Sequence, residues 1–320
     1  MWKTILRRLI LMIPQILLLS IIVFLLASMM PGDALTGLVD PTIDAAQKAA
    51  MREKLGLDKP WPERYFDWIT GILQGDWGRS WHHRQPTLKI IGQRVWPTLQ
   101  LSLLTVIISY GIALPLGLFS GRYQNSSFDK TVNLYTFVTY AIPSFVLGLF
   151  MIWLFGYILD WFPTTGTVSP GVEPGTIDFA LSRLYHIILP AITMALLSTT
   201  STIQYLRTGV IDAKTEDYVR TAKAKGVPEN VVYRKHIFRN SILPIAAFLG
   251  FTITGLLGGS VFTETVFNYP GMGKLFVESI ALRDFSVMIA ITLIYGFTTL
   301  LGSLLSDIIM VFVDPRIRIK

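Results

Sequence analysis

Cysteine is absent from this chain of 320 residues, and charged side chains are scarce. Without thiols the chain forms no disulfide, no thiolate metal site and no cysteine nucleophile. Only 15% of the residues are charged, against about 25% in soluble domains, while 52% are hydrophobic and the mean hydropathy is +0.51. This composition predicts a membrane protein. The net charge of +7 suggests nucleic acid by its size, but the basic residues follow membrane topology instead, so no nucleic-acid partner is expected.

Six apolar runs are long enough to cross a bilayer as helices, which takes roughly 20 residues each. The third run is the longest and contains Pro143, where a tilt or kink is expected. The first is too long for a cleaved signal peptide, so we expect a retained helix. The sequence therefore predicts an all-α, polytopic membrane protein with six transmembrane helices. The runs cover about Leu9–Met30, Leu99–Phe119, Thr131–Leu159, Ile187–Leu206, Ile242–Phe262 and Val287–Val313.

Counted over the termini and the short loops, lysine and arginine are concentrated on one side of these runs, which is the side of the N-terminus. The first outer loop also carries basic residues, but it is too long for this rule to apply. The two short loops on the other side carry only Arg183, Lys274 and Arg283. Because short basic loops stay in the cytoplasm, both termini are predicted to be cytoplasmic in a multi-pass protein of the cell membrane. The chain then divides into an N-terminal transmembrane helix (1–30), an extracytoplasmic helical segment (31–93), a five-helix core (94–313) with a cytoplasmic loop (207–241), and a cytoplasmic tail (314–320).

The largest cytoplasmic feature is the basic segment "EDYVRTAKAKGVPENVVYRKHIFRNSILP", from Glu216 to Pro244. Its first half predicts a short helix in which Thr215 caps the start and Gly226 takes the left-handed conformation at the end. Pro228 suits the first turn of a second helix. Both helices are too short to be stable alone, so each must pack against something. The apolar side of the second helix consists of Val232, Tyr233 and Ile237.

The residues of this segment leave two interpretations open. A basic amphipathic hairpin suits the surface of anionic lipid. A docking surface suits a soluble partner, and the small residues Ala222 and Gly226 favour this because they let another surface come close.

Several stretches of the chain carry a family resemblance. The stretch "YVRTAKAKG", followed by "RNSILP", resembles the cytoplasmic loop of permease subunits in binding-protein-dependent ABC importers, in particular the B-type subunit of oligopeptide and dipeptide permeases. The general signature of these loops begins Glu-Ala-Ala. Here those positions hold Arg220, Thr221 and Ala222, a departure usual for the peptide branch, with Gly226 in register. Nearly the whole chain is similar to that family, through "LGLDKPWPERYFDWITGILQGDWGRS", "VWPTLQLSLL", "VFTETVFNYPGMGKLFVESIALRDF" and "DPRIR".

The resemblance implies a fold, a function and a set of partners. The chain would adopt the type I ABC importer permease fold and translocate oligopeptides or dipeptides. It would work in the lipid bilayer with a second homologous permease subunit, two cytoplasmic ATPase subunits and an extracytoplasmic substrate-binding protein. The short cytoplasmic helix would be a coupling helix seated in a cleft of an ATPase. Its contact residues would be Tyr218, Arg220, Thr221, Ala222, Lys223 and Gly226.

We expect no ATP site in this chain. A phosphate-cradling loop needs G-x-x-x-x-G-K-[ST]. The nearest match, "GMGKL" at Gly271–Leu275, has leucine after the lysine, lacks the first glycine and lies on the outer side. ATP and Mg²⁺ are therefore expected on partner ATPases, with no cofactor and no enzymatic activity in this chain.

The main rival from another class is a carrier that works alone and is driven by ions. Such carriers place ionisable residues within the membrane despite their cost, whereas the six runs contain a single one, Asp307, near the cytoplasmic end. We expect Asp307 to pair with a basic group and Glu264, just beyond the fifth run, to contact water. An intramembrane enzyme is disfavoured because the runs show no nucleophile–base pair. Within the family, an importer of nickel or another small ligand is an alternative, although His82 and His83 alone do not predict a metal site.

The first outer segment predicts two helices. One covers Pro41–Gly56, and the other lies in "WPERYFDWITGIL", with Tyr65, Trp68 and Ile72 at helical spacing. The segment suits either a cap that meets the extracytoplasmic substrate-binding protein or a platform packed on the outer ends of the spans. The two roles can coexist.

Two further groups of residues are candidates for function. The turn in "VFNYPGMGKLF" is a candidate binding-protein contact or gate, with a purely structural turn as the alternative. It comprises Asn268, Tyr269, Pro270, Gly271, Met272 and Gly273. Uncharged polar residues of the fourth run are candidates for lining the path, with hydrogen bonding between helices as the alternative. They are Ser198, Thr199, Ser201 and Thr202.

Overall fold

The computed structural model describes residues 2–30 and 58–313. Within these ranges the protein is all-α, with one isolated bridge between Arg79 and Pro86 and no strand. The predicted helix over 41–56 and the tail 314–320 lie outside the described residues. The helices are α1 (Trp2–Met29), α3 (Trp61–Leu73), α4 (Thr87–Arg122), α5 (Ser127–Ala141), α6 (Ser144–Met151), η1 (Ile152–Ile158), α7 (Ile177–Ala213), α8 (Asp217–Ala224), α9 (Glu229–Val231), η2 (Val232–Ile237), α10 (Phe238–Ser241), α11 (Leu243–Gly255), α12 (Val261–Val266), α13 (Met272–Ala281) and α14 (Phe285–Val313).

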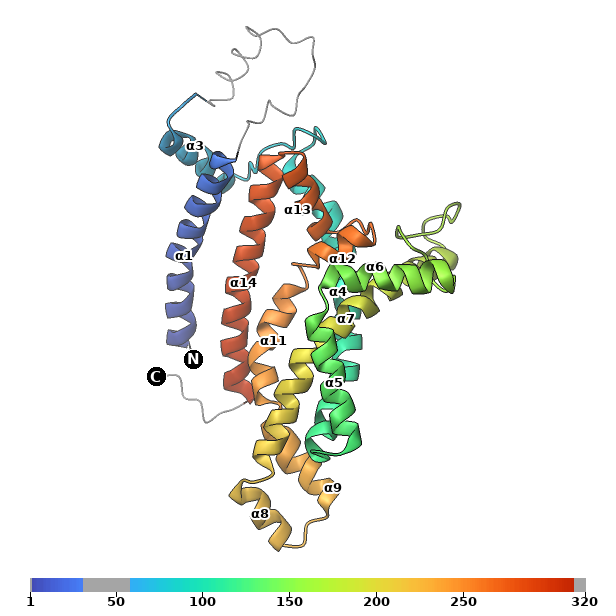
Figure 1. Ribbon diagram of the computed structural model, residues 1–320. Coiled ribbons are helices and arrows are strands. Elements are labelled where there is room, and N and C mark those ends of the chain that lie inside the picture. The colour runs from blue at the N-terminus through green and yellow to red at the C-terminus, as the bar shows by residue number, and fades with distance from the viewer. Residues whose placement is uncertain (1, 31–57, 314–320) are drawn as a thin grey trace.

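Four of the described helices are long and apolar enough to cross a membrane singly: α1, α4, α7 and α14. Two bent pairs bring the number to six when each pair counts as one span. They are α5 with α6–η1, and the stretch from α9 to α10 with α11. The upper number agrees with the six runs in the sequence, and the helices form an elongated bundle (Figure 1).

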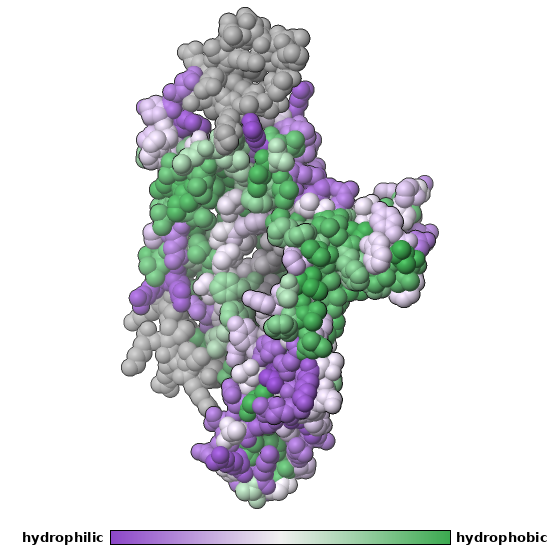
Figure 2. All heavy atoms as spheres, in the orientation of Figure 1, coloured by the Kyte–Doolittle hydropathy of each residue, from purple (hydrophilic) through white to green (hydrophobic). Residues whose placement is uncertain are grey.

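The third predicted span is broken rather than straight. α5 ends at Ala141, and α6–η1 leaves at an angle of 103°. Proline disfavours helical backbone in the residue before it, and Ile142 accordingly has extended backbone before Pro143 (φ −83°, ψ 123°). α6 projects sideways from the bundle (Figure 1), where it forms part of a hydrophobic arm (Figure 2). One continuous apolar run thus becomes two helices with different directions.

Close contact between α4 and α7 forms the centre of the bundle. A Cβ added at Gly121 would lie 2.7 Å from the Cβ of Val210, and one at Gly117 would lie 2.9 Å from the Cβ of Leu206. Glycine lets helix backbones approach closely in membrane bundles. α4 and α7 have 36 and 37 residues, so this contact joins two of the longest elements of the protein.

The start of α1 and the end of α14 lie on the same side of the bundle. Arg8 of α1 and Asp307 of α14 form an ion pair of 2.7 Å. This confirms the expected pairing of Asp307 with a basic group. α8 extends toward the same side (Figure 1), where hydrophilic side chains gather at the tip of the molecule (Figure 2). The distribution of lysine and arginine identifies this side as cytoplasmic.

The fifth span is shorter than the apolar run that predicted it. α11 ends at Gly255, and α12 and α13 follow on the outer side. α11 packs tightly on α14, because a Cβ at Gly250 would lie 2.1 Å from the backbone nitrogen of Ser306. The residues after Gly255 therefore belong to an outer turn rather than to a continuous transmembrane helix.

Candidate functional site

α8 lies at the cytoplasmic tip, where the sequence predicts the coupling helix (Figure 1). Its N-cap is Glu216 and not the predicted Thr215, whose hydroxyl donates instead to the carbonyl of Asp212 (2.8 Å). Gly226 has a φ of +72°, the predicted left-handed conformation just beyond the helix. The chain then returns through α9, η2 and α10, which form the predicted second helix.

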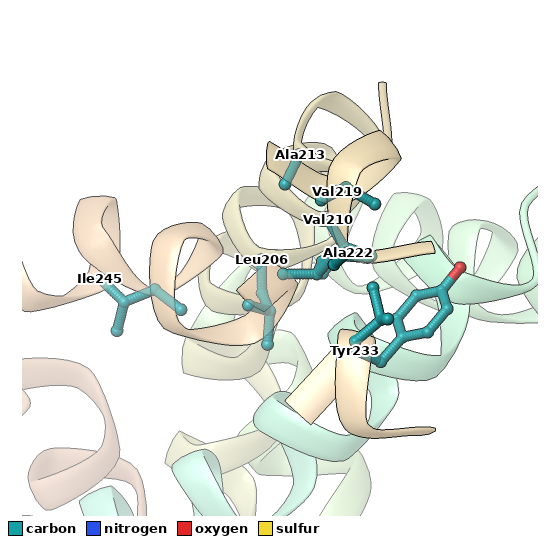
Figure 3. Close-up of a cluster of buried hydrophobic side chains, with 9 residues drawn as sticks. Leu206, Val210, Ala213, Val219, Ala222, Tyr233 and Ile245 are labelled. Carbon is teal, nitrogen blue, oxygen red and sulfur yellow. The ribbon is translucent and has the colours of Figure 1, made fainter. Parts of the chain in front are cut away.

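The inner face of α8 packs on the rest of the protein. Val219 is completely buried and Ala222 is 7% exposed. Both belong to a cluster of hydrophobic side chains from α7, α8, η2 and α11 (Figure 3). The expectation that Ala222 lets a partner approach is therefore wrong, because its small side chain packs against the protein's own core. The cluster consists of Leu206, Val210, Ala213, Val219, Ala222, Val232, Tyr233, Ile237 and Ile245.

The outer face of α8, which points away from the protein's core into the cytoplasm, is polar, basic and exposed. Of the six residues predicted to contact an ATPase, only Ala222 is withdrawn from this surface. Arg220 reaches Asp217 in a 3.5 Å pair between two highly exposed side chains, and such pairs add little stability. The exposed predicted residues are Tyr218, Arg220, Thr221, Lys223 and Gly226.

Two basic side chains attach this tip to the cytoplasmic end of α4. Nζ of Lys214 donates to the carbonyls of Gly121 and Arg122 at 2.9 and 3.2 Å, which are among the last carbonyls of α4 and attract a cation. The guanidinium of Arg122 lies 4.5 Å from the ring centroid of Tyr233 in η2, an attractive cation–π contact. The tip is therefore attached to α4 as well as to α7, of which it is the continuation.

A buried ion pair joins α5 and α7 near the same end. Arg207 donates to the two carboxylate oxygens of Asp129 at 2.6 and 2.9 Å. Asp129 is 2% exposed and also accepts hydrogen bonds from the hydroxyl of Ser120 and the backbone N–H of Asn125. This bidentate, fully bonded geometry is what a buried charge requires. No local signal in the sequence links Asp129 to Arg207, because both residues lie just outside the apolar runs.

On the outer side, the structure corrects the expectation for Glu264. The residue is fully buried rather than in contact with water. Its Oε1 accepts from the hydroxyl of Thr98 (2.9 Å), and its Oε2 accepts from the backbone N–H groups of Gly273 (2.7 Å) and Lys274 (3.1 Å) in the first turn of α13. A carboxylate there satisfies free N–H groups and suits the helix dipole. Burial raises the pKa of Glu264, and these hydrogen bonds oppose the increase.

The predicted contact or gate residues wrap around this carboxylate. A Cβ at Gly271 would lie 2.3 Å from the carboxyl carbon of Glu264, so only glycine fits at that position. Asn268 is exposed and Pro270 is half-buried, and these two retain accessible side chains. Most of the turn is therefore packed structure. The buried members are Tyr269, Gly271, Met272 and Gly273.

The candidate path residues of α7 divide between two faces. Ser198 and Ser201 are exposed, and Thr202 is half-buried. Thr199 is completely buried, with its hydroxyl 2.8 Å from the hydroxyl of Tyr135 in α5. The structure thus places Thr199 between helices and leaves Ser198 and Ser201 at the surface of this chain.

The adjacent histidines belong to an outer turn. The rings of His82 and His83 lie edge to face with their centroids 5.1 Å apart. The backbone N–H of His83 donates to the hydroxyl of Ser80 (2.9 Å), which in turn donates to the carboxylate of Asp284. Within residues 2–30 and 58–313 there is no group of three or more potential metal ligands of the His, Cys, Asp and Glu types.

The long apolar helices are those of a membrane-spanning protein, and α8 gives it a cytoplasmic helix with one face packed on the core and the other face exposed. The chain belongs to the binding-protein-dependent transport family. The model described as "Binding-protein-dependent transport system inner membrane component" matches residues 113–319, and the N-terminal model of such components matches residues 1–103. The protein is accordingly a multi-pass permease subunit of an ABC importer, located in the cell membrane, and not an enzyme.

Curated relatives match nearly the entire chain. It is 37% identical over 315 residues to the oligopeptide transport system permease protein AppB of Bacillus subtilis (strain 168), with 98% of each chain covered. It is 33% identical over 320 residues to the glutathione transport system permease protein GsiC of Salmonella typhimurium, with 100% of each covered. It is also 33% identical over 318 residues to a putative peptide permease protein of Brucella suis biovar 1, with 98% of each covered.

A solved structure shares the fold. The chain resembles an inward-facing conformation of the MetNI methionine ABC transporter with a TM-score of 0.57 and 16% sequence identity, over 71% of this chain and 97% of that one. The likeness shows the type I ABC importer permease fold that the sequence predicts.

Proposed function

We propose that the chain is one of two permease subunits in an ATP-driven importer of oligopeptides or dipeptides. The names of the relatives support this substrate class: AppB is an oligopeptide permease protein and GsiC a glutathione permease protein, and glutathione is itself a tripeptide. The proposed partners are a second homologous permease subunit, two cytoplasmic ATPase subunits that bind ATP and Mg²⁺, and an extracytoplasmic substrate-binding protein. This chain then transmits movement and does no covalent chemistry.

The observation that carries the proposal is the division of α8 into two faces. A hairpin resting on lipid turns its apolar side chains toward the bilayer, whereas Val219 and Ala222 pack into the protein's own core. The side chains left at the surface, such as Arg220 and Lys223, are polar and basic. This arrangement supports a soluble protein partner on the outer face.

Movement of α8 would reach the membrane along two connections. One is α7, which runs unbroken from Ile177 to Ala213. The other is α4, held by Lys214 and by the contact of Arg122 with Tyr233. Closure of the ATPases on ATP would therefore shift α4 and α7 together, as a rigid-body movement of packed helices, and switch the subunit between inward-open and outward-open states.

The exposed stripe of α7 is the proposed contribution of this chain to the path. Ser198 and Ser201 begin the stripe, and Tyr205 and Thr208 continue it at spacings of three and four residues. A peptide backbone is polar and uncharged, and so are these hydroxyl groups. On the outer turn, Asn268 is the proposed contact for the binding protein because its side chain is exposed.

Crosslinking from a unique thiol tests the coupling assignment, since the chain contains no cysteine. We would introduce Thr221→Cys on the outer face, attach a short photo-crosslinker in native membranes, and identify adducts by mass spectrometry. An adduct to an ATPase whose yield changes with ATP is expected. The neighbouring Ala222→Cys is the matched control, because its thiol is buried and should label poorly. Adducts to lipid alone, with the ATPases present, would overturn the proposal.

A further inference from the structure

The outer helix α3 carries an apolar face that the described part of the chain does not cover. Phe66 is 64% exposed and Leu73 is 80% exposed. These two residues are seven positions apart, so at 100° per residue their side chains point in nearly the same direction, with the half-buried Ile69 beside them. The neighbouring arc is polar and exposed. It consists of Glu63, Asp67, Thr70 and Gln74.

A second apolar arc of α3 packs on α1. The hydroxyl of Tyr65 lies 2.8 Å from that of Ser20. The rings of Trp68 and Phe24 have centroids 5.4 Å apart. α3 is therefore held beside the outer end of α1, as Figure 1 shows, through the side chains whose spacing predicted the helix. The sequence left two roles open for this segment, a cap and a platform. The contacts with α1 are those of a platform packed on the outer end of a span.

The contacts with α1 also set the depth of α3. At about 1.5 Å per residue, Ser20 lies about 14 Å below Met29 at the end of α1, and Phe24 about 8 Å below it. The run Leu9–Met30 is just long enough for a hydrocarbon core of about 30 Å. The side chains of Tyr65 and Trp68 therefore reach to the depth of the outer leaflet, which places α3 at the membrane surface rather than far above it.

We infer that α3 is an interfacial helix embedded in the outer leaflet, with Phe66, Ile69 and Leu73 in contact with lipid. At the same depth the exposed side chains of α1 are apolar as well: Ile22 and Leu26, on the side of α1 turned away from α3, are 45% and 61% exposed. Interfacial helices bury such a face about 5–10 Å deep and turn their polar face toward water. Asp67, which forms an exposed ion pair with Lys59 (2.7 Å), belongs to the neighbouring polar arc and lies about 100° round the helix from Phe66.

Site-directed spin labelling of the complete chain, reconstituted with its partner subunits in liposomes, tests this placement. Single substitutions Phe66→Cys and Leu73→Cys report the apolar face, and Glu63→Cys and Gln74→Cys are matched controls in the polar arc. All four positions are exposed, so the label should not disturb packing. We expect the ratio of collision rates with oxygen and with a water-soluble nickel chelate to be several-fold higher at positions 66 and 73 than at 63 and 74.

Two results would overturn the inference. Equal access of the nickel chelate to both faces would place α3 in water. Protection of positions 66 and 73 from both reagents would place a protein on that face, and protection that arises only when the extracytoplasmic binding protein is added would identify that protein as the occupant. These outcomes do not depend on the coupling role of α8 or on the substrate.

Discussion

The hydroxyl of Thr98 and the carboxylate of Glu264 are 166 positions apart in the chain and 2.9 Å apart in space. The same hydroxyl accepts a hydrogen bond of 2.7 Å from the backbone N–H of Met272. One side chain of α4 thus joins α12, which carries Glu264, to the start of α13. The groups that bond to the Thr98 hydroxyl are buried, so the outer turn is stable only when all of them are hydrogen-bonded at the same time.

Replacing Thr98 by valine should destabilise this outer turn. Valine keeps the shape but removes the hydroxyl, which leaves Oε1 of Glu264 and the N–H of Met272 without their partner. The expected cost is about 1–3 kcal/mol, seen as a lower thermal unfolding midpoint of the purified protein in detergent. Thr98→Ser retains the hydroxyl and should stay close to the wild type. Equal loss in both variants would show that the methyl group, and not the hydrogen bonds, matters.

Ionisation of Glu264 should make stability depend on pH. Burial raises the pKa of Glu264 above its ordinary value of 4.5, so between the two values the folded protein binds more protons than the unfolded chain. Stability contributed by this group is then full below pH 4.5 and falls as the pH rises toward the raised pKa. The comparison is the unfolding midpoint of the wild type and of Glu264→Gln across this range. The wild type should lose stability relative to Glu264→Gln as pH rises, and a relative gain would contradict the assignment.

Enlarging Gly121 should separate α4 from α7. In Gly121→Ala the new Cβ meets Val210 at 2.7 Å and the carbonyl of Arg207 at 2.8 Å, and overpacking of this kind costs about 1–3 kcal/mol. Peptide uptake and thermal stability should both fall. Gly111→Ala in the same helix meets nothing within 4 Å and gains helix propensity, so it should be neutral or stabilising. A neutral Gly121→Ala would mean that the helices separate without cost.

Removing one partner of the buried Asp129–Arg207 pair should be far worse than removing both. Arg207→Met leaves an unpaired carboxylate that is 2% exposed, with an expected cost of about 3–5 kcal/mol. The double variant Asp129→Asn/Arg207→Met removes that charge as well and should recover much of the loss. Unfolding midpoints of the two single variants and the double variant complete the cycle. Additive losses would show that the two residues act independently.

Changing Ala222 should loosen the cytoplasmic tip, while changing its neighbour should not. Ala222→Leu forces a larger side chain into the cluster around Leu206 and Tyr233, which should detach α8 from the core. Ala224 is exposed, so Ala224→Leu is the matched control. The measurement is the rate of trypsin cleavage within the basic segment in inside-out membrane vesicles, which should rise for Ala222→Leu only. Cleavage at the same rate in both variants would place Ala222 at the surface.

Several features were predictable because they depend on local composition. Hydrophobic runs and the positions of lysine and arginine determine which segments enter the membrane and which side faces the cytoplasm. Gly226 ends α8 in the left-handed conformation, and Val232, Tyr233 and Ile237 form the buried side of the second helix. In both cases the signal lies within a few residues of the structure that it predicts.

Other features were decided only by the tertiary structure. A helix pattern shows that Ala222 shares a face with Val219, but not whether that face meets the protein or a partner. The position of Glu264 just beyond the fifth apolar run likewise predicted contact with water. Its burial was not predictable, because its partner Thr98 and the free N–H groups of α13 come together only when α4, α12 and α13 pack. Membership of the family and the transmembrane topology thus follow from the sequence by itself. The burial of Glu264, the inward packing of Ala222 and the direction taken after Pro143 follow from contacts between segments distant in the chain.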